Sequence, residues 1–179
     1  MPAAGRLSLV VAAGAAFFGI GSAQADGLLG TSPAKPVQST HDAPASPAVP
    51  PAPGSPTALI KPFYERFGLE LDPSQRGNFT DPAKKVLDDD EALRKSGQGD
   101  CLDPDMALDN AAADGKQIAA SLKTLEAVNG DQAKVVVAFV EDGKPHRLEW
   151  KLKKVDGAWK IADLLSVTGE WELSQYQCE

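Results

Sequence analysis

Residues 146–155 alternate between apolar and polar side chains with the two-residue period of a β-strand. Leu148, Trp150 and Leu152 fall on one face of this run, and charged residues fall on the other. Such alternation is typical of a strand that packs one face against a core and exposes the other to water. The pattern therefore predicts a strand in a half-buried sheet.

Three further runs have strand character, and dipeptides that favour tight turns separate the four runs. The runs cover residues 116–128, 133–140 and 158–167, and the turns are Asn129-Gly130, Asp142-Gly143 and Asp156-Gly157. Asn-Gly and Asp-Gly adopt the left-handed conformations of hairpin turns at low cost. Four runs joined by three such turns predict an antiparallel meander.

The first half of the folded region has the spacing of helices instead. Residues 57–68 carry apolar side chains near helical spacing, and Pro62 either starts this helix or kinks it. Residues 80–97 form a second expected helix, with Pro82 in its first turn and Gly97 at its end.

Helices that precede an antiparallel sheet bury their apolar sides by covering one face of that sheet. The order of elements therefore predicts an α+β fold, with N-terminal helices packed on a curved antiparallel sheet. A strongly bent sheet covered in this way forms a cone with an open mouth. The domain is expected to span residues 57–179, which is long enough for one core.

The N-terminus has the layout of a secretory signal peptide. Arg6 precedes an uncharged run over residues 7–25, which ends in small residues suited to cleavage after Ala25. The competing interpretation is a retained membrane anchor, since the run is near the length that spans a bilayer. Cleavage predicts a periplasmic or secreted protein, and only an uncleaved leader would attach it to a membrane.

A segment rich in Pro, Ala and Ser follows over residues 26–56. It has almost no large apolar side chains, so it cannot bury enough surface to offset the ordering of its backbone. We expect a disordered tether with polyproline II character. It either spaces the domain from the membrane or cell wall, or is a passive tail.

The net charge of the chain argues against two classes of binding partner. Without Arg6, 17 basic residues stand against 25 acidic residues, which gives a net charge of −8. Nucleic-acid binding depends on Lys and Arg contacts to phosphate, so an acidic chain of this size is a poor candidate for it. Anionic lipid surfaces are disfavoured for the same reason.

Cys101 and Cys178 are the two cysteines of the chain. An even pair in an exported protein predicts a disulfide. The alternative is a reactive thiol or a metal ligand. The expected domain has one histidine, His146, and no CxxC motif, which favours the disulfide.

Three stretches resemble a known family. The stretch "LEWKLKKVDGAWKIADLL", residues 148–165, resembles the last hairpin of NTF2-like (cystatin-like) domains. Together with "LDPDMALDN" (102–110) and "NGDQAKVVVAFVEDG" (129–143), it resembles the secreted bacterial DUF3828 family. The likeness covers about residues 58–177 and implies the cone-shaped α+β fold. The family has no established reaction, so the likeness implies no catalytic residue, and Leu108 departs from the glutamine usual in the family.

The stretch "GDCLDPDMALDN", residues 99–110, gathers four aspartates around Cys101. An EF-hand loop needs a ligand and a glycine where Ala107 and Leu108 stand, so that calcium motif fails. An irregular calcium site is the open alternative. Asp-Pro at residues 103–104 favours a turn instead, which predicts a loop tied down by Cys101. No metal and no cofactor is predicted.

Five residues are candidates for binding a ligand at the mouth of the expected cone. They are Tyr64, Asp105, Asp109, Trp159 and Asp163. Asp163 follows Ile161 at strand spacing, so it would share the face of Trp159 in a regular strand, and a carboxylate buried there would have a raised pKa. The competing interpretation is a solvated or ion-paired Asp163. No catalytic residue is predicted, because His146 has no accompanying nucleophile motif.

These observations favour a non-catalytic domain that binds a small ligand or a protein of the cell envelope. One alternative is an enzyme that uses Asp109 or Asp163 in the cone as a general acid or base. Another is a periplasmic inhibitor or immunity protein, since an acidic domain suits a basic target.

Overall fold

The computed structural model describes residues 50–112 and 114–179. The expected signal peptide, residues 1–25, and the tether up to residue 49 lie outside this part of the chain. Within it, every helix is too short or too polar to cross a lipid bilayer.

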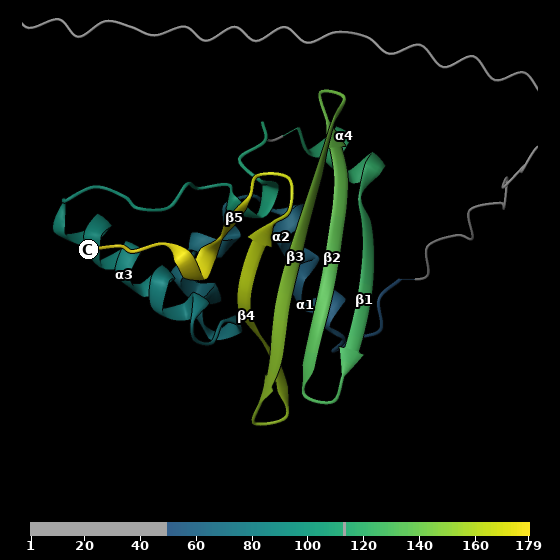
Figure 1. Cartoon of the computed structure of the whole chain (residues 1–179), viewed down its shortest axis with the longest axis horizontal. Coiled ribbons are helices and arrows are strands. Elements are labelled where there is room, and N and C mark those ends of the chain that lie inside the picture. The colour runs from purple at the N-terminus through teal and green to yellow at the C-terminus, as the bar shows by residue number, and fades with distance from the viewer. Residues whose placement is uncertain (1–49, 113) are drawn as a thin grey trace, which may run out of the picture. The chain divides into compact units, whose positions relative to one another are not determined.

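Five antiparallel strands form one sheet in sequence order, as the turns and alternation predict (Figure 1). The strands are β1 (Lys123–Asn129), β2 (Gln132–Glu141), β3 (Lys144–Val155), β4 (Ala158–Ser166) and β5 (Trp171–Glu172). The three predicted turns connect β1 to β4. The antiparallel meander is thus confirmed, with the short β5 added beside β4.

The helices lie mainly before the sheet in sequence and pack on one of its faces, which confirms the α+β class (Figure 1). The α-helices are α1 (Pro56–Ile60), α2 (Pro62–Glu65), α3 (Ala83–Ser96) and α4 (Gly115–Ser121). Four short 3₁₀ turns are η1 (Leu69–Leu71), η2 (Pro73–Asn78), η3 (Met106–Leu108) and η4 (Leu173–Gln175).

Pro62 divides the first expected helix into α1 and α2. It lacks a backbone N–H, so it begins α2 instead of continuing α1. Ser55 caps α1, because its hydroxyl accepts a hydrogen bond from the amide of Ala58 at 3.1 Å. The second expected helix is α3, which ends at Gly97 in the left-handed conformation with φ of 75°.

The prediction of a strand over residues 116–128 is wrong in its first half, because α4 occupies Gly115–Ser121. Asp114 caps this helix by accepting hydrogen bonds from the amides of Lys116 and Gln117. Ile118 and Leu122 are four residues apart, so the same spacing fits a helix that buries Ile118.

Aromatic side chains fill the space between the helices and the sheet. The rings of Phe63 and Trp150 lie 5.1 Å apart, and the Trp150 indole donates a hydrogen bond to the Tyr64 hydroxyl at 2.8 Å. Phe63, Tyr64, Phe139 and Trp150 are each at most 4% exposed. The helix-covered face of the sheet is therefore occupied by the core.

A β-bulge shifts the register of β4 against β3. Lys151 pairs with Asp163 and Leu152 with Ile161, so Ala162 is the extra residue. Asp163 consequently faces away from Trp150 and Ile161, on the side of Lys151. The predicted shared face of Asp163 and Trp159 is wrong for this reason.

The predicted disulfide is confirmed. Cys101 and Cys178 are bonded, their Cα atoms are 5.5 Å apart, and 77 positions of sequence separate them. The bond joins the loop after α3 to the C-terminal end of the chain. In the chain-entropy model, closing so long a loop stabilises a fold by roughly 4 kcal/mol.

We expect replacement of both Cys101 and Cys178 by serine to lower the free energy of unfolding by up to about 4 kcal/mol. Urea denaturation of the oxidised protein and of the double variant measures this difference. The wild type in a reducing agent is the matched control and should behave like the double variant. An unchanged unfolding midpoint in the double variant would show that the crosslink contributes nothing.

Candidate functional site

The acidic segment, residues 99–111, lies between α3 and α4, and its one element of regular structure is the short η3. Met106, Ala107 and Leu108 in it are each at most 1% exposed. Buried backbone amides need hydrogen-bond acceptors, and this segment has few partners in regular secondary structure. Carboxylates supply several of those contacts.

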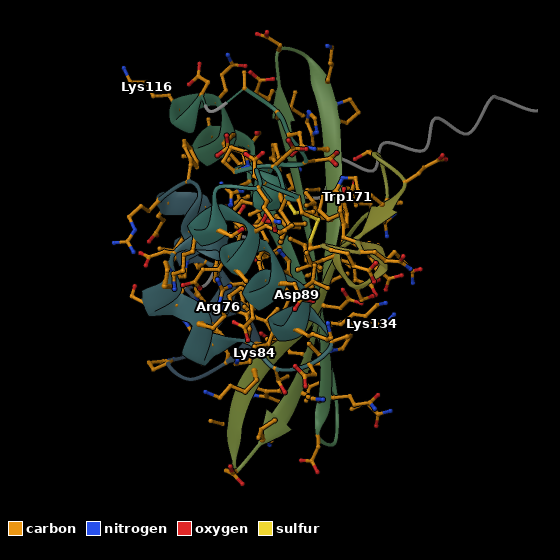
Figure 2. All side chains as sticks on the ribbon, turned by 90° about the vertical axis from the view of Figure 1, so that its left-hand side faces the viewer. Arg76, Lys84, Asp89, Lys116, Lys134 and Trp171 are labelled. Carbon is orange, nitrogen blue, oxygen red and sulfur yellow. A yellow bond between two sulfur atoms is a disulfide. The ribbon has the colours of Figure 1, made fainter. Side chains whose placement is uncertain are left out.

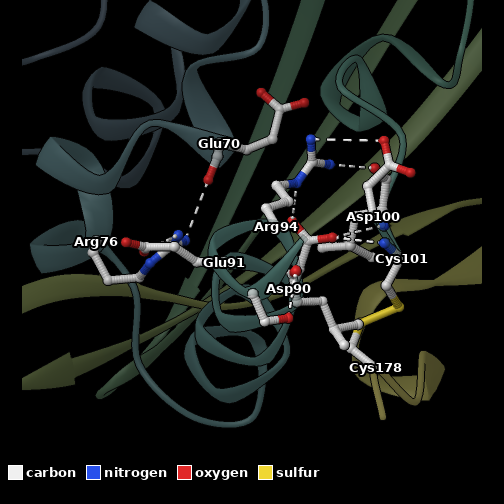
Figure 3. A network of polar contacts seen from close by, with 11 residues as sticks. Glu70, Arg76, Asp90, Glu91, Arg94, Asp100, Cys101 and Cys178 are labelled. Carbon is white, nitrogen blue, oxygen red and sulfur yellow. Dashed lines mark hydrogen bonds and ion pairs between the residues drawn. A yellow bond between two sulfur atoms is a disulfide. The ribbon is translucent and has the colours of Figure 1, made fainter. Parts of the chain in front are cut away.

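Asp90 of α3 holds the start of the segment (Figure 3). Its Oδ1 accepts hydrogen bonds from the amides of Cys101 and Leu102 at 2.8 and 2.9 Å. Its Oδ2 accepts one from Arg94 Nε at 2.6 Å, and Arg94 also donates to the Leu102 carbonyl at 2.7 Å. Burial acts to raise the pKa of Asp90, but the guanidinium and the two amides outweigh it and hold that pKa below its ordinary value.

Glu70 of η1 holds the middle of the segment. It is 2% exposed, and its Oε1 accepts a hydrogen bond from the amide of Ala107 at 3.0 Å. Its Oε2 is buried without a partner among the described residues. Burial raises the pKa of Glu70 to about 7, and the nearby Asp105 adds to the rise.

Asp109 ends the segment in a polar cluster at one end of the sheet. Its Oδ1 accepts a hydrogen bond from the Trp171 indole at 3.0 Å. Its Oδ2 accepts one from the Thr168 hydroxyl at 2.6 Å and lies 3.1 Å from His146 Nδ1. The His146 ring stacks on Phe139, with centroids 5.0 Å apart.

This cluster contains the residue types of a catalytic triad but not its connectivity. In a triad the hydroxyl is bonded to the imidazole, which takes up its proton. Here the Thr168 hydroxyl is bonded to Asp109, and His146 Nε2 is buried without a partner among the described residues. The cluster therefore lacks the hydroxyl–imidazole contact of a triad.

The charge state of Asp109 agrees with a structural role. Burial acts to raise its pKa, but hydrogen bonds from surrounding hydroxyls, His146 and Trp171 outweigh it and lower the pKa. A carboxylate with a lowered pKa is a weak general base. Asp109 is thus suited to fastening the segment to the end of the sheet.

Asp163 is buried on the other face of the sheet, beneath the C-terminal turn. Its Oδ1 accepts hydrogen bonds from the amides of Leu164 and Ser174, and its Oδ2 accepts one from the Ser174 hydroxyl at 2.8 Å. Burial raises its pKa, with a further contribution from Glu172. Lys151 Nζ lies 3.8 Å from Asp163 and pairs with Glu172. Both oxygens of Asp163 are therefore occupied within the domain.

The other predicted ligand-binding residues are dispersed. Tyr64 is buried against Phe139 and Trp150, and burial raises its pKa. Asp105 is partly exposed at the start of η3. Trp159 borders a surface depression of about 630 Å³ beside α1, with Lys154 Nζ 4.9 Å from its ring centre.

The structure consequently links Tyr64 to Asp109 through the stacked rings of Phe139 and His146. Asp163 and Trp159 lie apart from this link. A role in ligand binding stays a prediction for all five residues. In the described part of the chain, no group of three or more His, Cys, Asp or Glu residues is arranged to hold a metal ion.

Sequence reasoning missed Glu70, Asp90, Thr168 and Trp171 as fastening residues. For Asp90 a signal exists, because it follows Leu87 by three positions and so lies near the buried side of α3. Glu70 and Thr168 lie in short turns whose periodicity carries no such signal.

No family model and no curated protein matches this chain. A chain in the crystal structure of the native type VI effector–immunity complex Tae3–Tai3 from Ralstonia pickettii is 21% identical, with a TM-score of 0.43. The match covers 64% of this chain and 96% of that one. A phospholipid-binding protein from Ralstonia solanacearum, solved in complex with a phospholipid, is 15% identical over 68% of each chain, with a TM-score of 0.29. At these values neither likeness assigns a function, and membership of the DUF3828 family stays a prediction.

We expect Asp109→Asn to lower the free energy of unfolding by roughly 1–3 kcal/mol at pH 7, because it removes charge-assisted hydrogen bonds from a buried cluster. The pKa of Asp109 is lowered in the folded state, so its contribution is present above its ordinary pKa and is lost as the pH falls. The difference from wild type should therefore shrink in acid.

Urea denaturation between pH 7 and pH 3 checks this prediction. Asp156→Asn is the matched control, since Asp156 also has a positive φ but is exposed in a hairpin turn. A deficit of Asp109→Asn that is constant with pH would contradict the role given to its charge.

Proposed function

We propose that this chain is an exported, non-catalytic domain that binds a protein partner through the face of its sheet opposite the helices. This helix-free face consists of outward residues of β1 to β4. They are Lys123, Leu125, Ala127, Lys134, Val136, Ala138, Val140, Arg147, Glu149, Lys151 and Leu165. Figure 2 views the sheet from its side, with Arg76, Lys84 and Lys116 on the helical side and Lys134 on the other.

Three apolar side chains and Glu149 form a row across this face. Leu125 pairs with Val136, Val136 with Glu149, and Glu149 with Leu165, so the four residues are neighbours on one side of the sheet. Leu125 is 70% exposed, and nearby Val140 is 41% exposed. Apolar side chains grouped on an exposed surface are typical of an interaction site.

Charged residues border the row. Lys134 is paired with Glu149 at 2.8 Å, whereas Lys123 and Arg147 have no ion pair among the described residues. An apolar centre with a polar rim is the usual composition of a protein interface.

Strand β1 extends this surface to an edge of the sheet. All seven of its residues are exposed, and its neighbour within the sheet is β2 alone. An edge strand offers backbone donors and acceptors to a strand of another chain. The edge therefore supports contact with a protein more than with a small ligand.

The main support for this proposal is the difference between the two faces of the sheet. Buried aromatic residues fill the helix-covered face at β2 and β3, whereas the helix-free face leaves Leu125 and Val140 exposed beside the half-buried Val136 and Leu165. A partner therefore has access to the outside of the sheet instead of the inside of a cone.

The alternative functions gain less support. An enzyme based on Asp163 is favoured by its raised pKa, but both carboxylate oxygens already accept internal hydrogen bonds. An inhibitor or immunity protein for a basic target would need a surface other than the helix-free face, because Lys123 and Arg147 lie there.

Export is part of the proposal. The expected leader over residues 1–25 supports it, and so does the disulfide, since disulfides persist in oxidising compartments. Because Ser55 caps α1, the expected tether ends before that residue, and it would then either connect the domain to the membrane or cell wall or be a passive tail.

We expect Leu125→Lys to weaken capture of the partner at least about tenfold, because it places a charge in the apolar row. The measurement is chemical crosslinking of the tagged protein in intact cells, followed by quantification of the proteins that purify with it. Val128→Lys is the matched control, since Val128 is in the same strand, 52% exposed, and on the other face. Equal capture by wild type and Leu125→Lys would contradict the proposed surface.

A further inference from the structure

Glu70 of η1 differs from Asp90 and Asp109, the other two carboxylates that hold the acidic segment in place. Among the described residues, no cation or set of donors compensates a negative charge on it. Asp90 is paired with Arg94, and Asp109 accepts hydrogen bonds from hydroxyl and indole groups. Glu70 accepts one well-formed hydrogen bond, from the amide of Ala107, and the amides of Met106 and of Glu70 itself also act to lower its pKa; its second oxygen is buried and unpartnered among the described residues.

The groups around Glu70 disfavour a negative charge there. Asp105 of the acidic segment is a nearby carboxylate, and Tyr64 of α2 is a buried phenol. Arg76 of η2 contacts the backbone carbonyl of Glu70 at 3.4 Å, and its guanidinium pairs with Asp88 and Glu91 of α3 (Figure 3). A carboxylate in such surroundings costs considerable free energy when it ionises.

Glu70 contacts the middle of the acidic segment, so the free energy needed to ionise it is linked to the packing of that segment. Its contact with Ala107 lies between the attachment of Cys101 and Leu102 to Asp90 and the attachment of Asp109 to the end of the sheet. Met106 and Leu108 beside Ala107 are buried.

We propose that Glu70 is a proton-operated latch on residues 104–110. The neutral acid keeps its bond to Ala107 and leaves no uncompensated charge, so the segment stays closed. The ionised carboxylate gains hydration when the segment opens, and opening separates Asp109 from His146, Thr168 and Trp171.

The direction of the pH dependence follows from the pKa of Glu70, which is raised to about 7 from an ordinary value of 4.5. Because the pKa of Glu70 is raised in the closed state, the closed state has its full advantage over the open state at pH values below the ordinary pKa of a glutamate. This advantage is lost as the pH rises through about 7. The latch therefore holds in mild acid and loosens in mild alkali.

Hydrogen exchange of the Ala107 and Leu108 amides, corrected for the intrinsic effect of pH, tests the latch. If the open state has the ordinary pKa, the corrected exchange rate should rise about 30-fold between pH 5.5 and pH 8.5. A wild-type rate that stays constant over this range would overturn the proposal.

Two variants identify the group responsible. Glu70→Gln keeps an acceptor for Ala107 without a charge, so its corrected rate should stay flat. Asp90→Asn should speed exchange at Cys101 and Leu102 at every pH while keeping the pH-dependent rise at Ala107. A rise in Glu70→Gln equal to that of wild type would assign the effect to another group.

A direct titration keeps the test decisive if Glu70→Gln folds poorly. Carboxyl-carbon NMR of the wild type should show a Glu70 midpoint near 7. A midpoint near 4.5 would overturn the proposal, whatever the variant does.

Discussion

Carboxylate side chains, more than backbone partners, keep the irregular segment between α3 and α4 packed against the domain. Asp90 and Glu70 reach into this segment and accept hydrogen bonds from its amides, and Asp109 reaches out of it to the end of the sheet. The disulfide then ties the same segment to the C-terminal end of the chain. Because buried amides cannot go without acceptors, the rest of the packing at this end depends on these contacts.

In the described domain, the aspartates of this acidic segment and the carboxylates that hold it serve mainly as hydrogen-bond acceptors for other parts of the fold. Asp90, Asp109 and Asp163 each accept hydrogen bonds from internal donors on both carboxylate oxygens. Glu70 keeps one oxygen unpartnered, and this single exception gives the segment its sensitivity to protons. The outer face of the sheet is left as the accessible surface for a partner.

Much of the fold follows from local patterns in the sequence. Hairpin dipeptides and the alternation around Trp150 predict the meander, because a sheet with one buried face imposes a two-residue period. The disulfide follows from the cysteine count. The start of β1 is mispredicted because Ile118 and Leu122 satisfy both strand and helix spacing over so short a run. The bulge at Ala162 leaves no clear signal in the sequence, and it moves Asp163 to the opposite face.

The candidate site is less predictable than the fold because its contacts join residues far apart in sequence. Glu70 and Ala107 are 37 positions apart, and Asp109 and Trp171 are 62 apart. No periodic pattern records such pairs, and acidic residues in turns are usually solvated. The role of an aspartate or glutamate here depends on which amides lie near it once the sheet and helices are packed.

Native-state hydrogen exchange at pH 6 in increasing urea tests most directly whether carboxylates make the segment an integral part of the domain. If they do, the Cys101 and Leu102 amides exchange only through global unfolding, with the same free energy and urea dependence as the Trp150 amide in the core. Exchange of these two amides at a much lower free energy, with little dependence on urea, would show that the part of the segment held by Asp90 opens without global unfolding and would contradict this account.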